Sequence, residues 1–93
     1  MGKIYAGDVG VEILLNCQED ISAASVKNVI IYKPDGVELV KEALVVGGTQ
    51  LQYITQEGDL DLPGVYKVQP QITLLAWAGL GETATFIVYN KGG

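Results

Sequence analysis

The feature that most constrains this chain is a series of short runs in which apolar and polar residues alternate. From Val11 to Cys17 every second residue is apolar, and Glu12 and Asn16 fall between them, which is the period of a strand with one buried face. Such runs recur with a turn signal after about every ten residues, as in antiparallel sandwiches and small barrels. The sequence therefore predicts an all-β fold, an antiparallel β-sandwich of six to seven strands.

Three further segments have strand patterns. Val26 to Lys33 is rich in β-branched residues on both faces, as expected of a central strand. Val65 to Leu75 alternates cleanly, but Pro70 cannot donate to a ladder and so predicts an edge position or a bulge. Thr83 to Tyr89 returns after a glycine-rich turn and places Phe86 in the expected core.

The segment from Val37 to Val46 has two interpretations. Val37, Val40 and Leu44 fit a helical stripe, which Lys41 interrupts. The β-branched content and the position after a turn favour a strand, and a strand is our prediction.

The composition is that of one folded domain spanning residues 1–93. Apolar residues make up 48% of the chain, and the longest apolar run is far shorter than the roughly 18 residues of a membrane span. No signal-peptide pattern is found at the start, so we expect no membrane association and synthesis in a reducing cytoplasm.

The residue types that are missing exclude several function classes. The chain has no histidine, the commonest general base and metal ligand, and no arginine, the residue that grips phosphate with two hydrogen bonds. The net charge of −5 further disfavours a nucleic-acid partner. Cys17 is the single cysteine, its alternation predicts a buried structural thiol, and no base lies nearby in the sequence. We therefore expect no enzymatic activity, no catalytic residues, no cofactor and no metal.

Glu57, Asp59 and Asp61 place three carboxylates at alternating positions. Oxygen ligands of this kind suit calcium, but the twelve-residue loop with a terminal glutamate is missing. The pattern favours a solvated acidic loop, with a calcium site as the alternative.

Two short motifs are expected to define the fold. Pro34, Asp35 and Gly36 form the strongest turn signal, because proline presets φ, aspartate bonds nearby backbone and glycine accepts a positive φ. Gly64 and Tyr66 open the strand after Pro63, in a pattern that resembles the tyrosine corner of immunoglobulin-like domains.

Trp77 and Leu80 lie near the tip of the last hairpin, where polar residues are usual. They either pack under the end of the sandwich or form an exposed apolar anchor for a partner protein. They are the candidate interface residues.

Several segments together resemble small structural proteins of tailed phages and prophages, with an immunoglobulin-like domain similar to the N-terminal domain of baseplate upper proteins. The segments are Ile4 to Gly10, Ile31 to Gly36, Asp59 to Val68, Trp77, and Thr85 to Tyr89. The resemblance implies an immunoglobulin-like sandwich and a role in a virion, tail or baseplate, through contacts with other proteins. It carries no catalytic residues over to this chain.

The function predicted from the sequence is a non-enzymatic structural or assembly module. Its expected partners are other protein subunits, either further copies in a homo-oligomer or virion proteins, and its expected location is the virion or the bacterial cytoplasm. The alternative is a sandwich module that binds calcium or a carbohydrate, the latter through Trp77 with Tyr5, Tyr53 or Tyr89.

Overall fold

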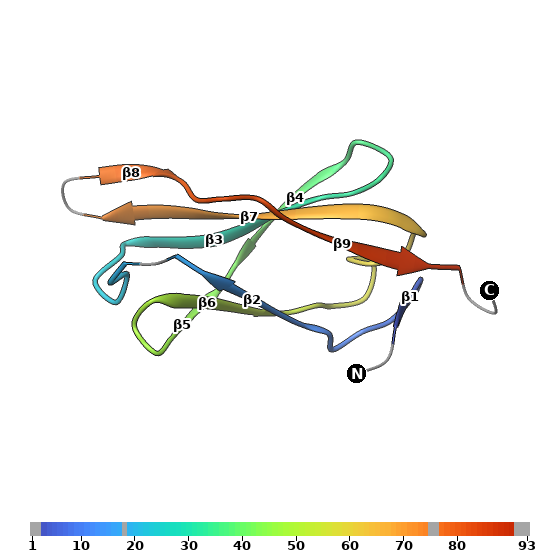
Figure 1. Ribbon diagram of the computed structural model, residues 1–93, viewed down its shortest axis with the longest axis horizontal. Helices are drawn as coiled ribbons and strands as arrows, with labels where there is room; N and C mark the ends of the chain where they lie inside the picture. The colour runs from blue at the N-terminus through green and yellow to red at the C-terminus, as the bar shows by residue number, and fades with distance from the viewer. Residues whose placement is uncertain (1–2, 18, 75–76, 91–93) are drawn as a thin grey trace.

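The computed structural model describes residues 3–17, 19–74 and 77–90, apart from the side chains of residues 77 and 80. These residues form nine strands, and none of them forms a helix long and apolar enough to cross a membrane (Figure 1). The strands are β1 (Ile4–Tyr5), β2 (Glu12–Asn16), β3 (Val26–Tyr32), β4 (Glu38–Glu42), β5 (Leu44–Val46), β6 (Gln50–Ile54), β7 (Gly64–Leu74), β8 (Trp77–Leu80) and β9 (Ala84–Tyr89).

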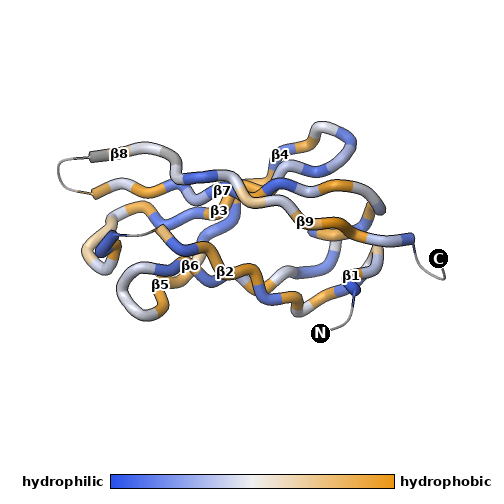
Figure 2. The backbone as a smooth tube through the Cα atoms, viewed as in Figure 1, coloured by the Kyte–Doolittle hydropathy of each residue, from blue (hydrophilic) through white to orange (hydrophobic). Residues whose placement is uncertain are grey.

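The strands form two sheets that enclose one core, which makes the chain all-β and consistent with a β-sandwich. Sheet A has the order β1-β9-β7-β3-β4, with β8 also paired to β7, and sheet B has the order β2-β6-β5. The β1–β9 pair is parallel and the other pairs are antiparallel. Hydrophobic and hydrophilic residues alternate along the strands (Figure 2). The core includes Ile13, Leu15, Leu51 and Tyr53 from sheet B, and Val29, Ile31, Tyr66, Val68, Ile72 and Val88 from sheet A.

The segment from residue 37 to residue 46 is extended, as predicted, and it passes from one sheet to the other. β4 pairs with β3 in sheet A, and β5 pairs with β6 in sheet B. Ala43 lies between them, buried, and its N–H donates to the carbonyl of Lys27 at 2.8 Å. One run of chain therefore contributes two strands, which is one reason why nine are found where six to seven were predicted.

Pro70 marks the second reason why the structure has more strands than predicted. It lies in β7, a central strand with β3 on one side and β8 and β9 on the other, so of the two predicted alternatives, an edge position or a bulge, the edge position is wrong. The carbonyl of Pro70 accepts from the N–H of Gly81 at 3.0 Å. The proline nitrogen, which has no hydrogen to donate, lies on this same side of β7, toward the returning chain. At that point the returning chain leaves the ladder over residues 81–83 and divides into β8 and β9.

Tyr66 joins the start of β7 to the loop before it. Its hydroxyl donates to the carbonyl of Leu62 at 2.8 Å and accepts from the N–H of the same residue at 3.2 Å. The ring is fully buried and stacks on Phe86 with centroids 5.5 Å apart. The buried ring and the hydroxyl bond to the backbone are what the motif around Gly64 and Tyr66 predicts, and the stacking on Phe86 is an additional finding.

The turn between β3 and β4 follows the predicted chemistry. Gly36 has a φ of 90°, and the carboxylate of Asp35 accepts from the N–H of Val37 at 3.1 Å. The N–H of Lys33 donates to the carbonyl of Val37 at 2.9 Å and closes the turn. Pro34 therefore lies at the surface, at the end of sheet A where β7 begins.

Candidate functional site

The acidic loop between β6 and β7 is the first candidate for chemistry, and the structure corrects the prediction that it is solvated. Asp59 is only 2% exposed. Its carboxylate accepts from the hydroxyl of Tyr53 and from the N–H of Gln56, the latter at 2.8 Å. The ammonium of Lys41 lies 3.4 Å from its other oxygen. Asp59 is buried because a tyrosine, a lysine and the backbone replace its water.

Tyr53 is held neutral by the same arrangement. Burial raises the pKa of its phenol far above the ordinary value of 10.0, and the hydrogen bond to the Asp59 carboxylate acts in the same direction. The pair closes the loop over the core, and neither group is available to a substrate.

Asp61 has a separate partner. The ammonium of Lys33 pairs with its carboxylate and also donates to the carbonyl of Gly58 at 3.1 Å. The hydrogen bond between the Lys33 ammonium and the Asp61 carboxylate raises the pKa of Lys33 and lowers that of Asp61. Glu57 is exposed. The three carboxylates do not converge, and in the described part of the chain no three His, Cys, Asp or Glu side chains are grouped to hold a metal.

Cys17 follows β2 and is half-buried against the core. Burial, and then the negative charge of Glu19, raise the pKa of its thiol above the ordinary value of 9.0. A raised pKa leaves less of the reactive thiolate at neutral pH, in line with a structural role.

The outer face of sheet A carries a row of uncharged polar side chains. The amide of Asn28 donates to Gln71 at 3.1 Å, and the hydroxyl of Tyr32 donates to Gln69 at 2.9 Å. The amide of Gln69 in turn donates to the carbonyl of Gly81 at 2.9 Å. Ile30 lies beneath this row and is only 8% exposed, although it points outward. The row makes this face well packed and nearly uncharged at its centre.

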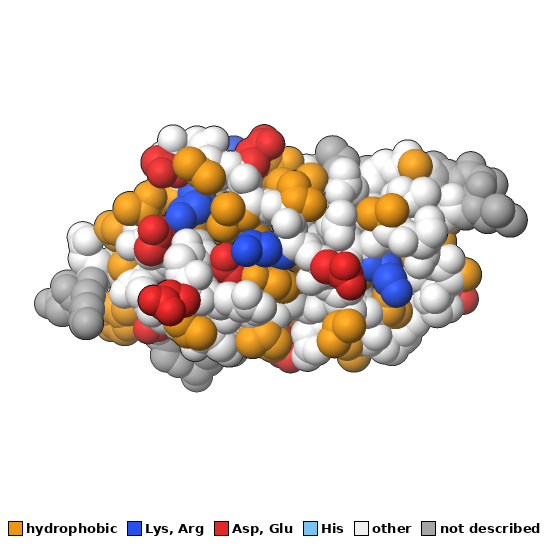
Figure 3. Space-filling model, turned by 180° about the vertical axis from the view of Figure 1, so that it is seen from behind, with side chains coloured by type: hydrophobic (Ala, Val, Ile, Leu, Met, Phe, Trp, Pro, Cys, Tyr) orange, Lys and Arg blue, Asp and Glu red, His pale blue; other side chains and the backbone are white. Residues whose placement is uncertain are grey.

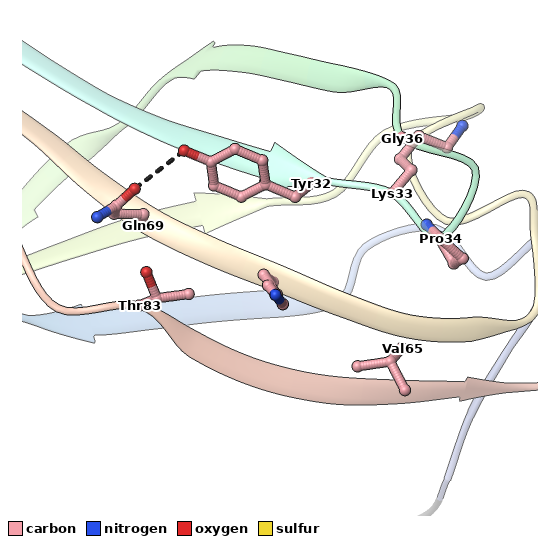
Figure 4. Close-up of a pocket in the computed structure, with 8 residues that line it drawn as sticks. Tyr32, Lys33, Pro34, Gly36, Val65, Gln69 and Thr83 are labelled. Atoms are coloured by element: carbon pink, nitrogen blue, oxygen red, sulfur yellow. Dashed lines mark hydrogen bonds between the residues drawn. The ribbon is translucent and has the colours of Figure 1, made fainter.

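A shallow hollow of about 510 Å³ lies beside this row (Figure 4). Tyr32, Val65, Lys67, Gln69 and Thr83 line it, together with residues of the turn after β3. The Tyr32 hydroxyl is bonded to Gln69. Two charged side chains line the hollow, Lys67 and Lys33, and Lys33 is paired with Asp61. The hollow offers a patch for a polar surface and has no grouping of acid and base.

Of the three tyrosines expected to bind a carbohydrate, Tyr53 lies apart from the other two. Tyr53 is in the core, and Tyr5 is half-buried with its ring centroid 6.3 Å from that of Tyr89. Tyr89 is 37% exposed, and the ammonium of Lys3 lies 4.8 Å from its ring centre. The side chains of Trp77 and Leu80, the predicted interface residues, lie outside the described residues.

The outer face of sheet B carries exposed aliphatic side chains that the sequence analysis did not single out. Leu14, Leu44 and Ile54 are 46%, 67% and 45% exposed. Leu14 and Leu44 lie on either side of Gln52 in one row across the three strands. The signal was present in the sequence, because Leu14 occupies the polar face of its strand, between Glu12 and Asn16.

Charged side chains are not gathered by sign on the side of the molecule shown in Figure 3, where acidic and basic groups are interspersed with hydrophobic ones. The lysines make no basic patch on that side.

A comparison with protein-family models, curated proteins and solved structures gives no match to this chain. Its function is therefore inferred from its own surfaces.

Proposed function

We propose that this chain is a non-enzymatic structural or assembly module that acts through contacts with other proteins. The observation that carries the proposal is the outer face of sheet B, where Leu14, Leu44 and Ile54 are all at least 45% exposed. Of the strand residues on that face, Glu12 alone is charged. Exposed aliphatic groups on an almost uncharged sheet are typical of a surface that a partner covers.

The chemistry of the polar side chains supports the same class of function. The buried carboxylate of Asp59 is engaged by Tyr53 and Lys41, and Asp61 is engaged by Lys33. Each pair fastens a loop, and neither has a free acid or base that faces a hollow. Binding without catalysis is the function that these groups support best.

The finer form of the fold that we propose is an immunoglobulin-like sandwich. Two features support it: the order β1-β9-β7-β3-β4 opposite β2-β6-β5, and the tyrosine whose hydroxyl bonds back to Leu62. With the divisions at Ala43 and opposite Pro70 set aside, seven runs of chain remain, the number of strands in a constant-type domain.

The resemblance to phage and prophage structural proteins gives the proposal its setting, a virion substructure or the cytoplasm in which it is assembled. The test is quantitative mass spectrometry of purified particles from a lysogen that encodes the chain. We expect the chain in a fixed ratio to the other particle proteins. Its absence from particles, together with a failure to bind any of their purified components, would contradict the proposal.

A further inference from the structure

The open edges of the two sheets differ in how well they are protected. Natural proteins protect edges with short strands, lysines, prolines, bulges or inward charges. β1 has two residues and β5 has three. β4 carries Lys41, which points inward to Asp59, between the exposed Glu38 and Glu42. β2, with five residues, has no lysine, proline or bulge in its register with β6. β8 is a further edge strand, paired with β7 alone, but it has four residues, so β2 is the longest edge strand without these forms of protection in the described structure.

The backbone groups on this edge follow from the hydrogen bonds on its other side. Val11 bonds toward β6, because its carbonyl accepts from the N–H of Thr55 at 3.0 Å and its N–H donates to the Thr55 hydroxyl. Cys17 also bonds toward β6, to the carbonyl of Thr49 at 2.8 Å. Because successive residues of a strand direct these groups to opposite sides, Glu12 and Leu14 direct theirs to the open edge.

An apolar hollow lies beside this edge. It has a volume of about 200 Å³ and is lined by Ile13 and Leu15 of β2 and by Phe86 of β9, across the gap between the sheets. β1 pairs with the last two residues of β9 only. Within the described part of the chain, no further strand covers the gap between β2 and the rest of β9. A strand added to β2 would gain backbone hydrogen bonds and also cover apolar surface.

We propose that β2 pairs antiparallel with β2 of a second copy, so that two three-stranded sheets become one sheet of six strands. This inference rests on the proposed function and narrows it to one surface and one partner. A two-fold axis at Leu14 places this residue opposite its own counterpart. Each Glu12 then lies opposite Asn16 of the other copy, an acid opposite a neutral amide, so no like charges face each other across the strands.

The side chains favour a second copy as the occupant. Leu14 is 46% exposed and would pack on Leu14 of the other copy. The two-fold axis places an apolar residue opposite Leu14 automatically, whereas an unrelated strand would need one at that position by chance. The outer faces of the two B sheets would become continuous, with Leu44 and Ile54 of both copies on one surface. The dimer thus doubles the apolar face assigned above to other assembly partners.

Cysteine cross-linking in the full-length chain tests this register. The background variant is Cys17→Ser, which removes the native thiol. In it, Leu14→Cys places two thiols across the two-fold axis, where paired residues lie about 5.5 Å apart between Cα atoms, within disulfide range. The matched control is Leu44→Cys, more exposed and on the same face but on β5. We expect oxidation to give a covalent dimer with Leu14→Cys at a rate at least about tenfold above the control.

A charge variant gives a second measurement that does not depend on oxidation. Leu14→Lys opposes two ammonium groups on the axis, whereas Leu44→Lys makes the same charge change away from it. We expect the first to weaken dimerisation about tenfold or more and the second to leave it within about threefold. Equal cross-linking of both cysteines, or a dimer lost through Leu44→Lys alone, would overturn the register. Particles that still contain the Leu14→Lys chain would leave the proposed function intact.

Discussion

Gly64 and Pro34 are in contact, and a Cβ atom on Gly64 would lie 2.8 Å from Cγ of the proline ring. Gly64 also has a φ of 133°, a conformation that residues with side chains rarely adopt. The first residue of β7 is therefore fitted against the turn that follows β3. Two motifs that the sequence analysis treated separately meet in space and fix the end of sheet A.

Replacing Gly64 tests this contact. We expect Gly64→Ala to lower the free energy of unfolding by about 2 to 4 kcal/mol, because the new methyl group meets Pro34 and the backbone is strained. The matched control is Gly36→Ala, since Gly36 has a φ of 90° but open space around it, and we expect about 1 kcal/mol. Urea denaturation measures both.

The proline supplies a further control. In a Pro34→Gly background both atoms that the new methyl group would meet, Cβ and Cγ of the proline, are gone, so Gly64→Ala keeps only its backbone strain and the two changes are not additive. Equal costs for Gly64→Ala with and without the proline would show that the contact contributes nothing.

Removing the Tyr66 hydroxyl tests the link to Leu62. Tyr66→Phe keeps the ring stacked on Phe86 but leaves both backbone groups of Leu62 without this partner. We expect a loss of about 1 to 2 kcal/mol in the free energy of unfolding. Tyr32→Phe is the matched control, because its half-buried hydroxyl bonds one side chain at the surface, and we expect at most about 0.5 kcal/mol. A Tyr66 variant as stable as the Tyr32 variant would contradict this role.

The two aspartates of the acidic loop are expected to differ in cost. Asp59→Ala removes a buried carboxylate and leaves Tyr53 and Lys41 without their partner, so we expect a loss of about 3 kcal/mol. Asp61→Ala removes a carboxylate with a 53% exposed side chain, and Lys33 keeps its bond to the carbonyl of Gly58. We expect a clearly smaller loss there, because the carboxylate is screened by solvent. The reverse order in thermal or urea unfolding would refute the assignment of Asp59 as the buried anchor.

Stability should fall at high pH because of the buried tyrosine. The folded state raises the pKa of Tyr53 above the ordinary 10.0, so above that pH the unfolded chain releases a proton that the folded chain retains. The stability present below pH 10 is therefore lost progressively as the pH rises toward the folded value. Absorbance of the phenolate measures this, and we expect Tyr53→Phe to remove a tyrosine that ionises only on unfolding.

The pH of unfolding, followed by circular dichroism on the same samples, is the reference for this titration. If the absorbance lost with Tyr53→Phe develops at a pH where the chain is still folded, Tyr53 is not held neutral by the fold.

Much of the fold is local enough to be predicted from the sequence. The alternation in β2, β3 and β7 and the turn at Pro34 depend on residues a few positions apart, and the structure matches them. The extended conformation of residues 38–46 was likewise predicted. Its passage between sheets at Ala43 was not, because it depends on a backbone bond to Lys27, sixteen positions earlier in the chain.

The features that decide the candidate surfaces are of this longer range. From the sequence, Asp59 is indistinguishable from the two other acidic residues of its loop. Its burial depends on Lys41, which the register of β4 brings to it. The row of amides on sheet A exists because β3 and β7 align Asn28 with Gln71. Leu14 is recognisable in the sequence as an apolar residue on the polar face of its strand. That it belongs to an apolar surface depends on Leu44, which reaches the same row only through the pairing of β5 with β6.

The most direct test of the account is the mass of the purified chain by light scattering over a wide range of concentration and salt. We predict that the mass rises from the 9.9 kDa of one chain toward twice that value. Added salt should favour the rise, because it screens the repulsion between two chains that each carry a net charge of −5. A mass of 9.9 kDa at every concentration and salt would contradict self-association through β2.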